Sequence, residues 1–196
     1  MYFKTLPYLY RLIDNQRIIN MVSSSDSENN TLENESLNNS IISDIVMKRV
    51  LQFLTGYISK EVIESKVWFI ENAFQSDDCF DDVPNKPGIY IMVAKKRSFV
   101  YPKKDSPVFY IGTSNQLKRR LKTHLKHYKT AKKAFNTNDS WQYSRYNYAI
   151  AFDADIYYMR ITGREKEKFL ESKAMEGFYD KYGALPVGNG AFSFRK

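Results

Sequence analysis

Cysteine is almost absent from this chain, and long apolar runs are missing. The single cysteine, Cys79, excludes a disulfide within the chain and a zinc site built on several cysteines. The chain has only two histidines, His124 and His127, and their HxxH spacing without a nearby cysteine does not favour zinc. Charged residues interrupt the apolar stretch over residues 1–22, so it predicts neither a signal peptide nor a membrane anchor. We expect a cytoplasmic or nucleoid-associated protein without membrane contact.

Acidic residues are scarce in the C-terminal part of the chain. Residues 86–196 carry 23 Lys and Arg against 9 Asp and Glu, whereas residues 1–85 carry 7 against 13. The resulting charges are +14 and −6. A polycation attracts nucleic acid because phosphate neutralisation releases condensed counterions. The charge division favours DNA as a partner, although a basic surface that only confers solubility would have the same composition.

Composition and periodicity divide the chain into three parts. The 196 residues, 43% of them hydrophobic, can fill one core of ordinary size. Residues 23–40 are almost entirely Ser, Asn, Asp and Glu, which predicts a disordered leader over 1–40. Helical spacing over 41–83, which includes Val67, Phe69 and Ile70, predicts an N-terminal helical extension that packs on the core, with contacts to DNA or a protein partner left open. The acidic residues between 77 and 82 indicate a solvated loop rather than a metal cluster.

Alternating side chains predict the strands that follow. Residues 89–94 place Ile89, Ile91 and Val93 on one face and Tyr90 and Met92 on the other. Residues 107–111 give the antiparallel partner, and the long connection allows a further β excursion over 98–101. A third strand is predicted over 155–161. Tyr90 and Tyr110 share a face only if the pairing register allows it.

Two long helices are predicted around these strands. Residues 113–115 are competent N-caps, and the helix after them runs to about Ala134 with its apolar stripe at Leu117, Leu121, Leu125 and Tyr128. Residues 135–150 indicate a loop rich in aromatic residues, which packs on the core or stacks on bases. Thr162 and Glu165 form a capping box that opens the last helix, and Gly183 is a suitable residue to end it.

One set of motifs goes beyond fold. Gly88-Ile89-Tyr90 is followed by Tyr110-Ile111-Gly112, and then by Arg120, His124 and Glu171. The order and spacing of this set over residues 86–190 resemble the GIY-YIG nuclease superfamily. The resemblance implies an α/β (α+β) domain over 84–196, a small antiparallel β-sheet flanked by helices. It also implies a divalent-metal-dependent endonuclease that hydrolyses DNA phosphodiester bonds with Mg²⁺ or Mn²⁺.

The resemblance also assigns roles to residues. Arg120 would hold the phosphate through its guanidinium fork, and Tyr110 would orient the phosphate or the water. Tyr90 would act as general base or position the water, which for a phenol requires help from nearby positive charge. His124 would relay a proton or hold the phosphate. Glu171 would bind the metal, with Glu176 as the runner-up, and Asn189 would brace the site.

Basic residues on the helix after the second tripeptide would contact nucleic acid: Lys118, Arg119, Lys122, Lys126 and Lys129. Two other functions fit the same residues. One is a catalytically silent nucleic-acid-binding module, and the other is a nuclease subunit active only with a partner bound through the N-terminal helices. A silent module has no need to keep Tyr90, Arg120 and Glu171 together, which favours the enzyme. The target, the preference between DNA and RNA, and the oligomeric state stay open.

Overall fold

The computed structural model describes residues 66–136, 144–163 and 167–189, all within the second of two compact units, which spans 44–196. The elements follow in the order β1 (Trp68–Ile70), β2 (Gly88–Ala94), β3 (Val108–Ser114), α3 (Leu117–Asn136), α4 (Ser144–Phe152), β4 (Ala154–Arg160) and α5 (Glu167–Tyr182). The predicted leader and the predicted helices up to residue 65 lie outside the described residues, as do Trp141 and the capping-box residue Glu165.

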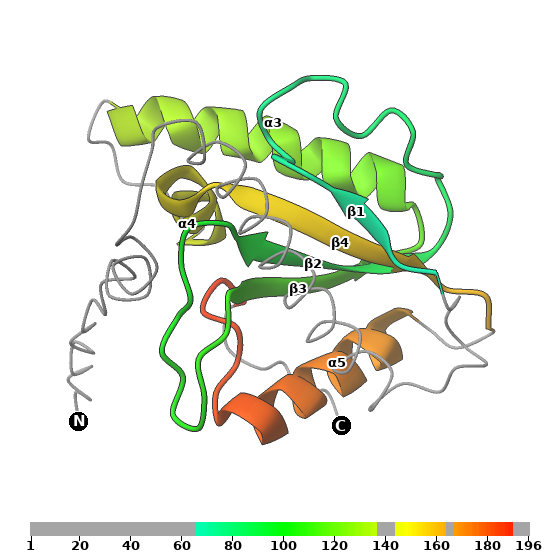
Figure 1. Ribbon diagram of the computed structural model, residues 1–196. Coiled ribbons are helices and arrows are strands. Elements are labelled where there is room, and N and C mark those ends of the chain that lie inside the picture. Colours follow the sequence, from blue (N-terminus) through cyan, green and yellow to red (C-terminus); the bar gives the residue numbers. More distant parts are fainter. Residues whose placement is uncertain (1–65, 137–143, 164–166, 190–196) are drawn as a thin grey trace, which may run out of the picture. The chain divides into compact units, whose positions relative to one another are not determined.

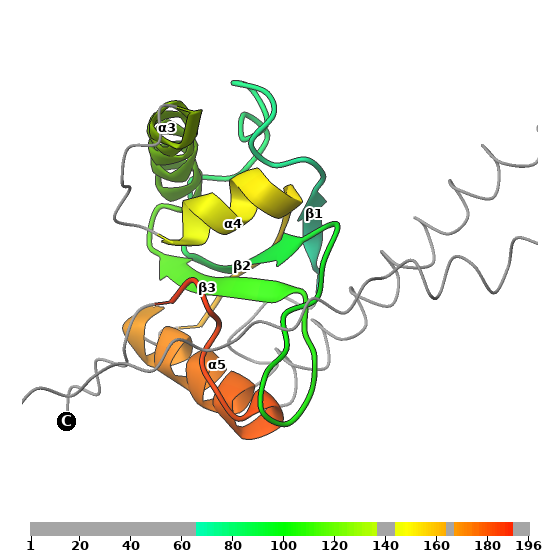
Figure 2. The ribbon, with the colours of Figure 1, turned by 90° about the vertical axis from the view of Figure 1, so that its left-hand side faces the viewer.

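The core of the fold is a four-stranded antiparallel sheet with the order β1-β4-β2-β3. Helices α3 and α4 cover one face, and α5 covers the other (Figure 1, Figure 2). Strand β2 is buried along its whole length because it lies between β4 and β3 and under helices on both faces. The predicted fold class, a small antiparallel sheet flanked by helices, is confirmed.

The strand predictions for β2, β3 and β4 are confirmed to within one residue at each end, except that β3 continues three residues further, to Ser114. The β excursion predicted in the β2–β3 connection is a single bridge between Phe99 and Ser106. Helix α5 ends as predicted at Gly183, which has a φ of 80° and donates its N–H to the Tyr179 carbonyl oxygen.

Two predictions in the described part of the chain are wrong. Trp68–Ile70 form strand β1 instead of a helix, because this short segment pairs with Ile156–Tyr158 at the edge of the sheet. The sheet of the domain predicted over 84–196 therefore takes an edge strand from before residue 84. Helix α4 occupies part of the expected loop over 135–150. Helix α4 is short, and its own side chains are buried or partly buried on most sides. Its sequence therefore lacks the one-sided apolar stripe from which a helix is predicted.

Candidate functional site

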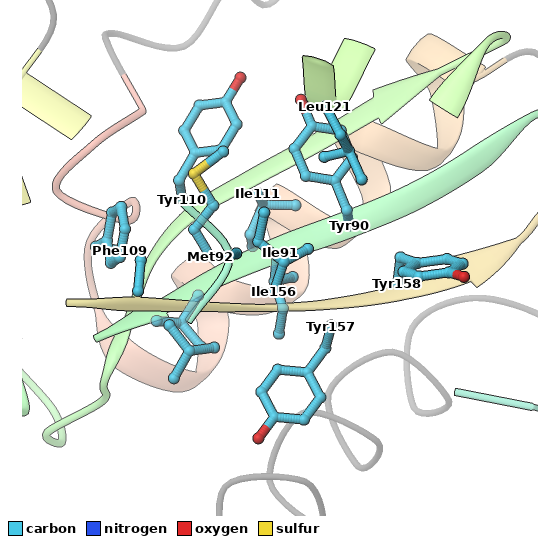
Figure 3. Close-up of a cluster of buried hydrophobic side chains, with 14 of the residues drawn as sticks. Tyr90, Ile91, Met92, Phe109, Tyr110, Ile111, Leu121, Ile156, Tyr157 and Tyr158 are labelled. Atoms are coloured by element: carbon cyan, nitrogen blue, oxygen red, sulfur yellow. The ribbon is translucent and has the colours of Figure 1, made fainter. Parts of the chain in front are cut away.

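The register of β2 and β3 brings the tyrosines of the two tripeptides to one face of the sheet. Tyr90 pairs with Gly112 and Met92 pairs with Tyr110, so Tyr90 and Tyr110 are diagonal neighbours. Their ring centroids are 6.0 Å apart. Figure 3 shows both rings projecting from the same side of the sheet, while Tyr157 projects from the other. The register condition for a shared site is thus met.

The glycines of the two tripeptides are needed for close packing. A Cβ atom at Gly112 would lie 2.6 Å from the Tyr90 hydroxyl oxygen, so any larger residue would displace the phenol. A Cβ atom at Gly88 would lie 2.9 Å from both Leu117 Cδ2 and the Met159 carbonyl oxygen. Gly88 therefore lets the start of α3 pack on the sheet, and Gly112 leaves room for the Tyr90 hydroxyl.

Helix α3 brings Arg120 and His124 to this hydroxyl. The Arg120 Nε donates to the Tyr90 hydroxyl oxygen at 3.3 Å, and His124 Nε2 lies 2.7 Å from the same oxygen. Tyr90 and His124 are each only 1% exposed. Because residues four apart on a helix lie on one side, Arg120 and His124 reach the phenol together. The structure thus gathers three of the predicted site residues around one oxygen atom.

Burial sets the charge state of Tyr90. Removal from water raises the pKa of Tyr90, Tyr110 raises it further, and Arg120 lowers it, with the result well above the ordinary value for tyrosine. The arginine expected to help Tyr90 lose its proton is present, but burial has the larger effect. Tyr90 is therefore a neutral phenol in this structure.

Burial also keeps His124 neutral. Removal from water lowers the pKa of His124, and the positive charges of Arg120 and Arg145 together with His127 lower it further, to well below the ordinary value. A neutral imidazole has one N–H donor and one nitrogen acceptor. His124 uses both, because its Nδ1 lies 2.8 Å from the hydroxyl oxygen of Tyr146 on α4.

Arg145 on α4 covers the second tyrosine. Its guanidinium carbon lies 4.4 Å from the centroid of the Tyr110 ring, which is a cation–π contact. For the aromatic residues around Arg145, the sequence leaves both packing on the core and stacking on bases open, with packing favoured for most of them. In the structure Tyr146 is buried against His124, and Tyr148 packs against Phe99 and Phe109. Both tyrosines therefore belong to the core.

Glu171 reaches the edge strand β3 from the face of the sheet that α5 covers. Its Oε2 accepts a hydrogen bond from Thr113 Oγ1 at 2.9 Å. Thr113 directly follows Gly112, which pairs with Tyr90. Glu176, the runner-up, is exposed and forms an ion pair with Lys173 at 2.8 Å. The structure therefore connects Glu171, and not Glu176, to the strand that carries Tyr110 and Gly112.

Asn189 binds the free edge of β3. Its Oδ1 accepts from the Ile111 N–H at 2.8 Å, and its Nδ2 donates to the Ile111 carbonyl oxygen at 2.7 Å. The adjacent Gly188 N–H donates to the Phe109 carbonyl oxygen at 2.7 Å. These bonds satisfy backbone groups that an edge strand otherwise exposes. They fix Ile111, which lies on β3 between Tyr110 and Thr113, the residue that contacts Glu171.

The lysines of α3 lie on a different side of the helix. Lys122 forms an ion pair with Asp81 at 2.6 Å, Lys129 pairs with Asp77, and Lys118 Nζ donates to the Asp81 carbonyl oxygen at 2.6 Å. This acidic loop, residues 76–83, runs along α3 (Figure 1). The side chain of Lys126 is exposed, as is that of Arg119. In the described residues, no three His, Cys, Asp or Glu side chains gather as a metal-binding group.

Sequence reasoning missed two residues that contact the site. The sequence predicts Thr113 only as an N-cap, whereas its hydroxyl donates to Glu171. It places Tyr146 in the loop predicted over 135–150, whereas its hydroxyl contacts His124 Nδ1. No sequence signal indicates either contact, because 58 residues separate Thr113 from Glu171 and 22 separate His124 from Tyr146.

Comparisons with known proteins agree with the geometry. The family model for the GIY-YIG catalytic domain matches residues 86–153, which includes the two tripeptides, Arg120 and His124. No curated protein and no solved structure gives a significant match. Within the described residues, no helix has the length and apolar character that crossing a membrane requires.

Proposed function

Because residues 86–153 match the GIY-YIG catalytic domain, which assigns the chain to the GIY-YIG nuclease superfamily, we propose that this protein is a divalent-metal-dependent endonuclease that hydrolyses DNA phosphodiester bonds. The observation that carries the proposal is the pair of contacts at the Tyr90 hydroxyl oxygen, 3.3 Å from Arg120 Nε and 2.7 Å from His124 Nε2. A buried phenol held by a cation and an imidazole is poised for proton transfer next to a phosphate-binding group.

The hydrogen bonds support a direction for that transfer. Arginine can only donate, so Tyr90 accepts from Arg120 and has its own proton left for His124 Nε2. As a water molecule attacks the phosphorus atom, Tyr90 accepts the water's proton and passes its own to His124. The phenolate, which burial disfavours, then never has to accumulate. Tyr90 serves as general base in concert with His124.

Arg120 and Tyr110 act on the phosphate. The guanidinium keeps donors besides Nε for phosphate oxygens, and its positive charge offsets the negative charge that grows there in the transition state. Tyr110, under Arg145, orients the phosphate or the water through its hydroxyl. Asn189 supports Tyr110 by holding the backbone of the adjacent Ile111 on β3.

Glu171 is the proposed metal ligand. Mg²⁺ usually takes one or two protein carboxylates and keeps several waters, and one half-buried carboxylate matches that donor set better than it matches a closed zinc site. Thr113 occupies Oε2 and leaves Oε1 for the ion. When bound, Mg²⁺ or Mn²⁺ would add positive charge at the phosphate.

The test is cleavage of supercoiled plasmid by the purified full chain, with Mg²⁺, Mn²⁺ or EDTA. We expect nicked or linear product with either metal and none with EDTA. Glu171→Gln should abolish cleavage but keep metal-free DNA binding, whereas Glu176→Gln should stay active. Plasmid binding without any cleavage by the wild type would favour the silent binding module. An active Glu171→Gln protein together with an inactive Glu176→Gln protein would move the metal to Glu176.

A further inference from the structure

A line of hydrogen bonds continues from the catalytic tyrosine beyond His124. His124 Nδ1 lies 2.8 Å from the Tyr146 hydroxyl oxygen, and this oxygen lies 3.3 Å from Nδ1 of His127. Tyr90, His124 and Tyr146 are buried, whereas His127 is partly exposed. We propose that Tyr146 and His127 complete a proton relay that connects Tyr90 to the surface of the protein, and this proposal rests on the nuclease function proposed above.

The relay requires donation in one direction along this line. Tyr90 accepts from Arg120, so its own proton is available to His124 Nε2, and the relay takes Tyr90 as the donor of this hydrogen bond. With Nε2 as acceptor, the neutral ring carries its proton on Nδ1 and donates it to Tyr146. The Tyr146 hydroxyl then donates to His127 Nδ1. Each group is thus ready to release a proton toward the surface while it accepts one from the site.

The proton balance of one cleavage event follows from this order. Water loses a proton to the Tyr90 oxygen as its own oxygen bonds to phosphorus and the bond from phosphorus to the leaving oxygen breaks. The Tyr90 proton moves to His124 Nε2, the His124 Nδ1 proton moves to Tyr146, and the Tyr146 proton moves to His127 Nδ1. His127 releases a proton to solvent, and the leaving oxygen takes one from solvent. Exchange along the same line restores the starting arrangement after product release.

The surroundings of His124 explain why the proton should not stop there. Arg120 on the same helix, Arg145 and Tyr146 on α4, and Tyr90 and Tyr110 on the sheet all face its ring, and both arginines repel an imidazolium. His127 is partly exposed, so a proton that reaches it can pass to solvent.

Two variants interrupt the line at different points. Tyr146→Phe removes one hydroxyl, and His127→Gln keeps a hydrogen-bonding side chain that cannot take up a proton. Tyr148→Phe is the matched control, because it removes a tyrosine hydroxyl from the same helix outside the relay. The readouts are the single-turnover cleavage rate from pH 5.5 to 8.5, DNA affinity and thermal stability of the full chain.

We expect each relay variant to cleave roughly tenfold or more slowly at unchanged DNA affinity. The double variant should be no slower than the slower single variant, because both interrupt one path. Rates of His127→Gln should rise with added imidazole buffer. Effects that multiply in the double variant, or rates equal to that of Tyr148→Phe, would overturn the relay while leaving the nuclease intact.

A measurement without substrate tests the donor order separately. Nitrogen NMR of the histidine rings should show His124 with its proton on Nδ1, and the Nδ1 resonance should shift in Tyr146→Phe. A proton on Nε2 would reverse the donors and overturn the relay even in an active enzyme. A wild type that shows the Nδ1 tautomer but never cleaves DNA would contradict the nuclease function, and the relay with it.

Discussion

Helix α3 has two sides that differ in almost every physical respect. One side carries Arg120, His124 and His127, which face the buried phenol of Tyr90 or the hydroxyl of Tyr146. The other carries Lys118, Lys122, Lys126, Lys129 and Lys133, whose surroundings are water and the acidic loop. Each of Lys122, Lys126 and Lys129 comes two positions after a residue of the first side, about 200° around the helix.

One helix can therefore keep the residues expected to act in cleavage apart from the residues expected to attract DNA. A charge in the buried environment around Tyr90 acts strongly on a phosphate because little water screens it. A charge on the lysine side is screened by water and salt and contributes little individually. The lysines should therefore set how tightly DNA binds, and the residues on the Tyr90 side should set how fast it is cleaved.

The largest expected effect comes from one matched pair of truncations on α3. Arg120→Ala should slow cleavage roughly 10² to 10³-fold, since it removes a charged donor from the transition state, and should also weaken binding. Lys122→Ala should change cleavage and affinity by less than roughly fivefold, because exposed ion pairs contribute little. Single-turnover cleavage rates and DNA-binding curves of both variants test this expectation. Equal losses from the two variants would mean that the two sides of the helix do not differ in function.

A charge reversal tests the lysine side as a whole. Lys122→Glu, Lys126→Glu and Lys129→Glu combined should weaken DNA binding roughly 10²-fold and lower the slope of log affinity against log salt by roughly two to three. The cleavage rate at saturating DNA should hold. The control has the same net charge at a different place: Lys103→Glu, Lys104→Glu and Lys181→Glu. Equal weakening by the control would show that net charge, and not the α3 lysines, determines binding.

The sequence predicts those parts of the fold and of the site that depend on residues close together in the chain. The spacing of Arg120 and His124 and the alternation around Tyr90 are local patterns, so the helix, the strands and the shared face follow from them. Strand β1 depends on pairing with residues almost ninety positions later. The ion pairs between the acidic loop and α3 span 41 and 52 residues. Such contacts form only after the sheet and helix have come together, and no periodicity records them.

A smaller effect is expected on stability, and it belongs to the buried side. His124 has a folded-state pKa well below its ordinary value, so below pH about 6.5 the unfolded chain takes up a proton that the folded chain refuses. The free energy of unfolding should fall as pH drops from 7 to 5, by at most about 1.4 kcal/mol per pH unit from this group. Urea unfolding of the wild type and of His124→Gln at several pH values measures this contribution to the free energy of unfolding.

Subtracting the free energy of unfolding of His124→Gln from that of the wild type isolates the contribution of His124. Burial raises the pKa of Asp155, which gives stability that is lost as pH rises through the raised pKa, the opposite sign. Asp155 is present in both proteins, so its contribution cancels in the difference. The difference should therefore rise with pH between 5 and 7. A difference independent of pH would show that folding does not lower the pKa of His124.

The smallest expected effect concerns the acidic loop, which would compete with DNA for the lysine side of α3. Lys122 donates to Asp81 and Lys129 to Asp77, so phosphates bound there would have to displace these carboxylates or share the lysines with them. Asp77→Asn with Asp81→Asn keeps the side-chain shapes but removes the competing negative charges. DNA should then bind roughly two- to fivefold more tightly at low salt, with an unchanged cleavage rate at saturating DNA.

The control pair, Asp105→Asn with Asp180→Asn, makes the same charge change away from α3 and should improve DNA binding less. If both pairs tightened binding equally, the loop would act only through net charge. If neither did, the lysine side of α3 would lie outside the DNA contact.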